Sequence, residues 1–110
     1  MGMIDKLLVL LERGQDSALL RFSLGQEYSK AQQWDAALRH LTRAVELDPQ
    51  YSAAWKLYGK ALAASDRPAD AIGVLEQGIR VAEQRGDVQA AKEMQVFLKR
   101  ARKAAGSEPE

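Results

Sequence analysis

Cysteine is absent from this sequence, and histidine occurs once, as His40. Without cysteine the chain can form no disulfide, has no thiolate nucleophile and lacks the usual ligand of structural zinc sites. Hydrolases and transferases need a nucleophile, a base and an orienting group, or several metal ligands, around one pocket. The sequence offers no such set, and its eight glycines form no phosphate-binding motif. We therefore predict that the chain is not an enzyme and binds no metal or cofactor.

An excess of charge of one sign is also missing, as are long apolar runs. Sixteen basic and fifteen acidic residues leave a formal net charge of +1, so no overall field favours nucleic acid or an anionic membrane. The apolar run from Leu7 to Leu11 is too short to span a bilayer. Nothing in the composition requires an oxidising compartment. We expect a cytoplasmic protein with no nucleic-acid partner and no membrane partner.

Three features could indicate another site, and each has a simpler interpretation. The tryptophans, Tyr28 and Tyr58 could stack on nucleotide bases, but their helical spacing favours a place in the core. The basic residues between Lys99 and Lys103 could bind phosphate, but cations in a last helical turn also complement the helix dipole. His40 is next to an apolar position that we assign to the core, and we expect it to be half-exposed and without a functional role.

What the sequence does contain is helical periodicity over nearly its whole length. Apolar residues make up 46% of the chain and charged residues 28%, and a length of 110 residues suits one folded domain. Apolar positions recur with helical spacing and never alternate with period two, so we expect helices and no strands. Six helices are predicted, at residues 4–13, 17–31, 34–47, 51–65, 68–85 and 87–104.

Turn and capping residues mark the ends of these helices. Gly14 is a C-terminal stop, and Pro68 suits the first turn of the helix that it opens. Asp16 and Asp87 are placed to cap the helices that follow them. After the last helix, residues 106–110 have nothing to pack against and are predicted to be a disordered tail.

The sequence repeats itself along the chain. A fixed number of residues separates Gly25 from Gly59, and we call this displacement the repeat shift. The same displacement separates Leu41 from Leu75. Two antiparallel helices approach closely only where small residues lie at their crossing, with larger side chains on either side. The repeat shift should therefore align small residues with small ones and large residues with large ones. Further matched pairs are Leu24 and Tyr58, Tyr28 and Leu62, Ala37 and Ala71, Leu38 and Ile72, Ala44 and Gly78, and Val45 and Ile79.

This pattern resembles the tetratricopeptide repeat, a helical hairpin of about 34 residues with the motif W-x2-L-G-x2-Y…A-x3-F…P. The second unit reads WKLYGKAL from Trp55 to Leu62 and continues with Ala71 and Leu75. The first unit reads LGQEY from Leu24 to Tyr28 and continues with Ala37, Leu41, Ala44 and Pro49. The first unit departs from the motif at Arg21, where the family prefers Trp.

The resemblance implies a single all-α domain at 1–105, folded as a short right-handed superhelix of antiparallel helical hairpins. At the end of the second unit, Glu83 occupies the position where the motif has Pro. When the repeat shift is applied once more, Glu93 aligns with Gly59. The last helix is therefore not a regular third repeat. We expect it to act as a cap, because isolated repeats cannot bury their apolar faces. The predicted organisation is an N-terminal helix at 4–13, repeats at 17–49 and 51–85, and a capping helix at 87–104.

The family resemblance also implies a function. Tetratricopeptide proteins typically bind extended or helical peptides in a concave groove lined by the first helix of each hairpin. We therefore expect a scaffold whose partner is a protein or peptide that is acidic or has a free C-terminus. Some members hold a terminal carboxylate with Lys, Arg and Asn side chains, and this chain resembles them only partly because it contains no Asn. The candidate groove residues are Phe22, Gln26, Lys30, Lys56, Lys60, Lys92, Gln95 and Lys99.

Two alternatives stay open at this level. The lysines of the candidate groove could be a solvated helix face that binds nothing. The apolar run from Leu7 to Leu11 could instead make the chain a structural or assembly subunit that associates through its N-terminal helix. On either interpretation the isolated chain is a monomer or a weak homodimer.

Overall fold

The computed structural model describes residues 2–106 of the chain, most of which are helical. This agrees with the all-α fold predicted from the sequence. The described residues form six helices and no strand: α1 (Met3–Glu12), α2 (Ala18–Lys30), α3 (Trp34–Leu47), α4 (Ser52–Ala64), α5 (Pro68–Arg85) and α6 (Val88–Ala104). Apart from Gly106, the predicted tail lies outside the described residues.

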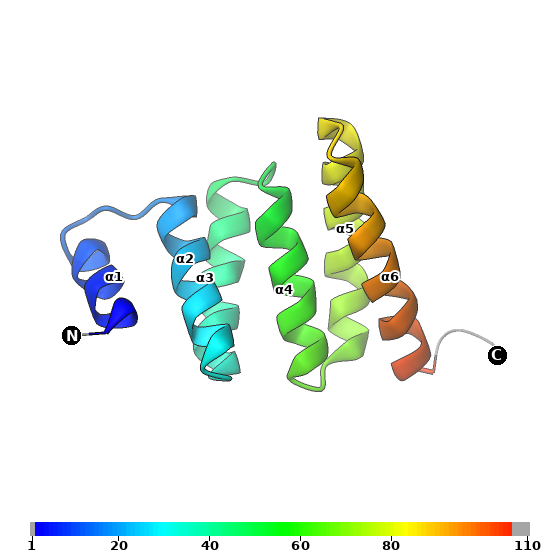
Figure 1. The fold of residues 1–110 in the computed structure, drawn as a ribbon, viewed down its shortest axis with the longest axis horizontal. Coiled ribbons are helices and arrows are strands. Elements are labelled where there is room, and N and C mark those ends of the chain that lie inside the picture. The colour runs from blue at the N-terminus through cyan, green and yellow to red at the C-terminus, as the bar shows by residue number, and fades with distance from the viewer. Residues whose placement is uncertain (1, 107–110) are drawn as a thin grey trace.

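The helices form an elongated two-layer array, with α2, α4 and α6 in front and α3 and α5 behind them (Figure 1). Helices α2 and α3 form one antiparallel hairpin, and α4 and α5 form the next. Helix α6 packs against both α4 and α5, whereas α1 packs against α2 alone. The principal extents of 49 × 29 × 18 Å reflect this side-by-side arrangement.

Each hairpin closes on a glycine, as the repeat shift predicts. A Cβ added to Gly25 would lie 2.5 Å from Cγ of Leu41, and one added to Gly59 would lie 2.6 Å from Cγ of Leu75. Both leucines have no exposed surface. Since real Cβ atoms do not approach carbon so closely, only glycine allows these two helix pairs to come together in this way.

The turn within each hairpin is also repeated. Gln32 has a φ of 58° and Asp66 has a φ of 63°, and the repeat shift relates these two positions. The backbone N–H groups that follow these residues donate to equivalent carbonyls, from Gln33 to Tyr28 at 2.9 Å and from Arg67 to Leu62 at 2.8 Å. The repeat therefore extends to a left-handed backbone conformation that L-residues adopt at a cost.

One capping prediction is wrong. Asp16 does not cap α2; Ser17 does, because its Oγ accepts a hydrogen bond of 3.1 Å from the N–H of Leu20. Ser17 immediately precedes the first helical residue, which is the position where a side-chain oxygen reaches the free N–H groups. Asp87 caps α6 as predicted, accepting from the N–H of Ala90 at 3.2 Å.

Helix α6 follows the repeat with a longer step. The N-cap residues are Ser17, Tyr51 and Asp87, so the first step equals the repeat shift and the second exceeds it by two. Helix α5 has 18 residues where α3 has 14, but residues 86–87 connect it to α6 where residues 48–51 connect α3 to α4, so the net increase is two. At the longer step, Ala54 coincides with Ala90, Tyr58 with Met94 and Leu62 with Leu98. Helix α6 thus occupies the place of the first helix of a third hairpin.

Candidate interaction groove

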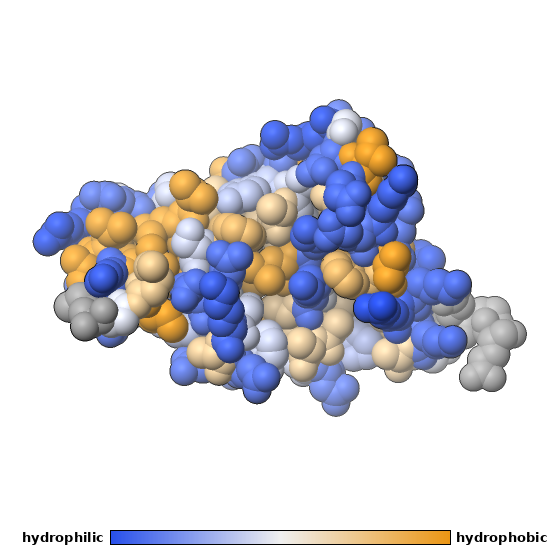
Figure 2. Space-filling model, viewed as in Figure 1, coloured by the Kyte–Doolittle hydropathy of each residue, from blue (hydrophilic) through white to orange (hydrophobic). Residues whose placement is uncertain are grey.

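The first helices of the successive hairpins, α2, α4 and α6, present one continuous face of the molecule. Figure 2 views this face and shows apolar surface over α1 and the middle of the array, with hydrophilic surface gathered at the end formed by α5 and α6. Counting from the N-caps, equivalent positions on the three helices are Phe22, Lys56 and Lys92 in one row and Gln26, Lys60 and Val96 in the next.

Lys56 is already neutralised within this face. Its Nζ lies 3.0 Å from Oε2 of Glu93, which joins α4 to α6, and the Lys56 side chain is 29% exposed. The hydrogen bond from Lys56, followed by one from Gln89, holds the pKa of the Glu93 carboxyl below its ordinary value. Lys56 therefore positions α6 against α4 and contributes little free positive charge to the groove.

Lys60, one turn further along α4, forms no ion pair within the described part of the chain. Its Nζ lies 5.4 Å from the centroid of the Phe97 ring on α6, which is cation–π distance. The residue is exposed. Because Lys60 is exposed and has no ion-pair partner among the described residues, it is available to a ligand at the centre of the groove.

Two small hollows flank Lys60, and its side chain lines both. The hollow between α2 and α4 has a volume of about 270 Å³, and the hollow between α4 and α6 has about 210 Å³. The first is lined by Gln26, Ser29, Lys30, Trp34, Leu57, Lys60, Ala61 and Ala64. The second is lined by Lys60, Ala63, Phe97 and Arg100. Both linings are mostly apolar, with the positive charge between them.

The hollow between α2 and α4 also holds an unsatisfied polar atom. The Oγ of Ser29 is buried and has no hydrogen-bond partner among the described residues. Buried polar side-chain atoms are normally paired, and an unpaired one calls for a partner such as a ligand or water. Ser29 lines the hollow, but its Oγ is too deeply buried to be a contact point for a ligand there.

The structure brings some of the predicted groove residues together and separates others. Gln26, Lys30 and Lys60 line one hollow. Lys30 is paired with Glu27 at 3.1 Å. The ring of Phe22 packs against Tyr51, with centroids 5.0 Å apart, so it serves the core as well as the groove.

On α6 the predicted residues do not adjoin the central lysines. Glu93 and Phe97 are the α6 residues that contact Lys56 and Lys60. Lys92 and Lys99 are exposed at positions equivalent to Lys56 and Ala63 on α4, at the outer edge of the groove. Gln95 occupies the position of Gly59, which in a complete hairpin faces the second helix. No described helix follows α6 to take that place.

The sequence reasoning missed several groove residues for an identifiable reason. Glu93, Phe97 and Arg100 were overlooked because the repeat shift aligns α6 with α4 two positions out of register. At the longer step Phe97 falls on Ala61, a position that faces the preceding first helix. The matching of Ala54 with Ala90 and Leu62 with Leu98 is the signal that could have found them.

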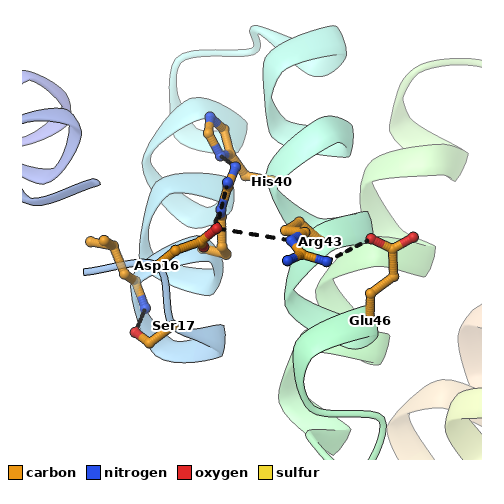
Figure 3. Close-up of polar contacts among 7 residues, drawn as sticks. Asp16, Ser17, His40, Arg43 and Glu46 are labelled. Carbon is orange, nitrogen blue, oxygen red and sulfur yellow. Dashed lines mark hydrogen bonds and ion pairs between the residues drawn. The ribbon is translucent and has the colours of Figure 1, made fainter. Parts of the chain in front are cut away.

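A polar network lies at the start of α2, where Arg21 replaces the tryptophan found at the equivalent Trp55. Arg21 donates from Nε to Oδ1 of Asp16 at 2.7 Å and from Nη1 to Nδ1 of His40 at 3.1 Å. Arg43 lies 3.9 Å from Asp16 and 3.6 Å from Glu46, extending the network along α3 (Figure 3). The Arg21 hydrogen bond, as the largest contribution, lowers the pKa of the Asp16 carboxyl.

His40 is not half-exposed, and this prediction is wrong. Only 7% of the residue is exposed, because Arg21 and Tyr28 cover it; the Tyr28 ring stacks on it at 5.5 Å between centroids. Arginine can only donate, so Nδ1 of His40 is the acceptor and carries no proton. Burial, followed by the charges of Arg21 and Arg39, lowers the pKa of His40. The histidine is a neutral structural acceptor.

A larger hollow, of about 500 Å³, lies elsewhere, between α3, α4 and the start of α5. It is lined by Asp35, Leu38, Arg39, Thr42, Tyr58, Leu62 and Arg67. Arg67 is already paired with Asp70 at 2.9 Å. Four of its seven lining residues belong to α3, which is not one of the groove helices. The smaller hollows beside Lys60 are therefore the better candidate.

Within residues 2–106, no three acidic or histidine side chains lie close enough together to hold a metal ion. In the same range no helix combines the length and apolar character needed to cross a bilayer.

Comparison with known proteins identifies the family. A sequence profile of the tetratricopeptide repeat matches residues 28–94, which is more than half of the chain. The chain belongs to the tetratricopeptide repeat (TPR) family. This confirms the resemblance seen in the repeated positions of Gly25 and Gly59, and it explains why the hairpins close on glycine.

Relatives share the fold over nearly their whole length. A TPR repeat-containing protein of Pseudomonas aeruginosa is 50% identical over 98 residues, covering 89% of this chain and 93% of that protein. The solution structure of a Bordetella parapertussis protein has a TM-score of 0.81 at 44% identity and covers 94% of this chain and 90% of its own. A TPR domain protein from Salinibacter ruber has a TM-score of 0.76 at 30% identity, covering 86% and 95%. The TPR chain therefore has the predicted fold, a short right-handed superhelix of antiparallel hairpins.

Proposed function

We propose that this TPR chain is a non-catalytic interaction scaffold that binds a peptide segment of a partner protein in the groove formed by α2, α4 and α6. TPR proteins are typically scaffolds without catalytic activity. The observation that carries the proposal is the position of Lys60, an exposed cation that lines two apolar hollows and forms no ion pair among the described residues.

The chemistry of the groove suggests the kind of peptide. A carboxylate placed at Lys60 gains a charge-assisted hydrogen bond, and apolar side chains on either side of it can fill the two hollows. The exposed Gln26 supplies a hydrogen-bonding group in the hollow between α2 and α4. The best ligand is therefore an extended segment with one acidic residue between two apolar ones. A free C-terminal carboxylate can take the place of the acidic side chain.

Net charge alone does not support the proposal, because Lys56 and Lys30 are paired with Glu93 and Glu27. Reversing Lys56 to Glu would place two carboxylates side by side and disturb the contact between α4 and α6. Lys60 is the cleaner target, since its replacement removes a charge and leaves the ion pair between Lys56 and Glu93 intact.

The proposal can be tested with a labelled peptide that contains a Leu-Glu-Leu core, compared with the same peptide carrying Gln at its centre. Fluorescence anisotropy should show binding of the acidic peptide that weakens as salt rises, because partly exposed charges are screened beyond about 10 Å at 0.1 M. The Lys60→Gln variant should bind it about tenfold more weakly, the effect expected for one charge-assisted hydrogen bond.

A matched control uses Lys6→Gln, which removes the same charge from α1, outside the groove. This variant should bind the acidic peptide as the parent chain does. Equal affinity for the acidic and the neutral peptide, or equal binding by the Lys60→Gln and Lys6→Gln variants, would rule out Lys60 as the recognition residue.

A second candidate function is assembly through the N-terminal helix. None of the ten residues of α1 is buried, although most of them are apolar. Sedimentation of the free chain over a range of concentrations tests this function, because self-association through α1 requires a concentration-dependent dimer.

A further inference from the structure

Helix α1 corresponds to the second helix of a hairpin whose first helix is not among the described residues. The repeat shift, which relates α3 to α5, also places α1 on α3. It matches Ile4 with Leu38, Leu7 with Leu41 and Leu11 with Val45. Within the described residues, α1 is therefore a second helix without its first helix, and it packs against α2 as α3 packs against α4.

The missing first helix explains why α1 is poorly buried. Leu41 and Leu75 are completely buried because Gly25 and Gly59, on the first helices of their hairpins, cover them. Leu7 is at the equivalent position and is only half-buried. Its side chain has the size and place to pack on such a glycine, and no helix in the described part of the chain supplies one.

A hollow marks the place of the missing helix. It has a volume of about 540 Å³ and lies between α1 and the start of α2. Leu7 and Leu10 of α1 form one wall, and Leu19, Leu20 and Ser23 of α2 form the other, with residues 14–17 between them. We call this hollow the N-terminal slot.

The residues in both walls of the slot are equivalent to residues that pack against the first helix of a hairpin elsewhere in the array. Leu7 is equivalent to Leu75, which packs on Gly59 of α4. Ser23 is equivalent to Leu57, which lines the contact between α4 and the preceding first helix, α2. A helix in the slot would thus repeat the packing that α2 and α4 already show.

An exposed apolar side chain lines the slot, because Leu19 is 65% exposed. The equivalent of Leu19 on α4 is Ala53, which is half-buried. Large apolar side chains gathered at one end of an array mark an interaction surface, and the orange surface over α1 in Figure 2 belongs to this end.

The geometry specifies what can fill the slot. The occupant is a helix antiparallel to α1, with a glycine or alanine where it crosses Leu7, because a larger residue at this crossing would clash with the leucine side chain. Apolar residues must flank the small one to cover Leu10 and Leu19.

A second copy of this chain does not offer such a helix within the described residues. Gly73 of α5 has open space beside it, but the residues one turn away include Asp70, Glu76 and Gln77, where apolar residues are required. On α3 the accessible small residue, Ala36, is likewise followed one turn later by the polar Arg39 and His40. The glycines of α2 and α4 are already engaged with Leu41 and Leu75. Helix α1 contains no glycine or alanine, and α6 has Gln95 at the position of the small residue. We therefore propose that the N-terminal slot is a docking site for an amphipathic helix of a different polypeptide, with a glycine or alanine at its centre.

Recognition in the slot is apolar. Asp16 is the one charged residue that lines it, and Asp16 is held by Arg21 and Arg43. Binding there should be almost independent of salt, in contrast to binding at Lys60. The slot and the groove are consequently separable, and either can fail experimentally without the other.

The first test supplies the helix as a peptide. A synthetic peptide of residues 51–65 is a suitable probe, because it carries the small residue and the apolar flanks of α4. Added to the full chain, it should shift the methyl NMR signals of Leu7, Leu10 and Leu19 and leave that of Val96 in place. A matched peptide with Gly59→Leu should bind at least about tenfold more weakly.

Because isolated helices of this length are marginal in water, a second test supplies the helix covalently. Residues 51–69 are placed before Gly2 in the full chain in place of Met1, so that the grafted Gly59 precedes Leu7 by the same interval that separates Gly59 from Leu75. The graft should raise the denaturant midpoint and bury Leu19. The same graft with Gly59→Leu should lose most of that increase.

Two outcomes would overturn the proposal. One is a graft that leaves the midpoint and the Leu19 methyl signal unchanged, or that acts equally with glycine and leucine at the crossing. The other is a stable dimer of the unmodified chain that dissociates on Leu19→Lys, because the slot would then belong to a second copy. A loss of peptide binding at Lys60 bears only on the groove.

Discussion

Gly25 and Leu41 meet so closely that the backbone of α2 rests directly on the leucine side chain; a Cβ at Gly25 would lie 2.5 Å from Cγ of Leu41. Gly59 and Leu75 repeat this relationship one hairpin later. The two contacts set the distance between the helices within each hairpin, whereas the hollows of the groove lie between the first helices of successive hairpins.

Glycine substitutions should therefore have opposite effects at two helical positions. Gly59→Leu should lower the free energy of unfolding by about 1–3 kcal/mol through overpacking against Leu75. Gly73 lies inside α5 with nothing near its absent Cβ, so Gly73→Ala should raise it by up to about 1 kcal/mol through helix propensity. Chemical denaturation measures both, and a Gly59→Leu variant as stable as the parent would contradict the packing described.

Shortening the leucine on the other side of the contact should be costly. Leu41 is completely buried, so Leu41→Ala removes buried apolar surface and leaves a cavity. The expected loss of unfolding free energy is about 2–5 kcal/mol. Urea titration followed by circular dichroism measures it. The exposed Leu47 provides a control, because Leu47→Ala should cost far less.

The stability of the chain should fall as pH falls from about 7.5 to about 5. The pKa of His40 is lowered in the folded state, so its neutral form stabilises the fold above the unfolded-state value of about 6.5, and this contribution is lost as pH falls through that value towards the folded-state pKa. Each unit by which the pKa is lowered corresponds to about 1.4 kcal/mol. Thermal unfolding across this pH range gives the slope.

The His40→Val variant is the matched control, since Val74 occupies the equivalent position in the next hairpin. Its stability should vary much less over the same pH range, because Asp16, the acidic member of the network, has a lowered pKa and stays ionised there. A parent and a variant with identical slopes would show that the slope comes from other groups.

The turn at Gln32 should be improvable. This residue holds a φ of 58°, which costs an L-residue with a Cβ on the order of 1 kcal/mol. Gln32→Gly should raise the unfolding free energy by up to about 1 kcal/mol. Differential scanning calorimetry would detect the rise in Tm. Gln33→Gly makes a useful comparison, because the φ of Gln33 is −94° and glycine brings no relief there.

Sequence periodicity was enough to predict the six helices and the crossings at Gly25 and Gly59, because these features depend on residue size at regular intervals. It was not enough for α6. The longer α5 and the shorter connection after it together advance the register by two, and a shift of constant length cannot detect that advance. The contact between Lys60 and Phe97 was hidden for this reason.

Contacts that depend on long side chains were harder to predict. Arg21 stands where the family has tryptophan, and the sequence gives no sign that its guanidinium reaches both Asp16 and His40. The apolar spacing in α3 predicts His40 at the edge of the core, yet it is buried because Arg21 and Tyr28 cover it from α2. Such burial depends on a neighbouring helix and leaves no trace in the periodicity of α3.

The attachment of α1 to α2 alone has a kinetic consequence. In a linear array each element is held only by its neighbours, so an end element can detach while the remainder stays folded. Helices α3, α4 and α5 are each held from both sides, whereas α1 has one neighbour and no buried side chain. In heavy water, the amide protons of α1 should exchange through frequent local opening, long before those of α4 exchange through global unfolding.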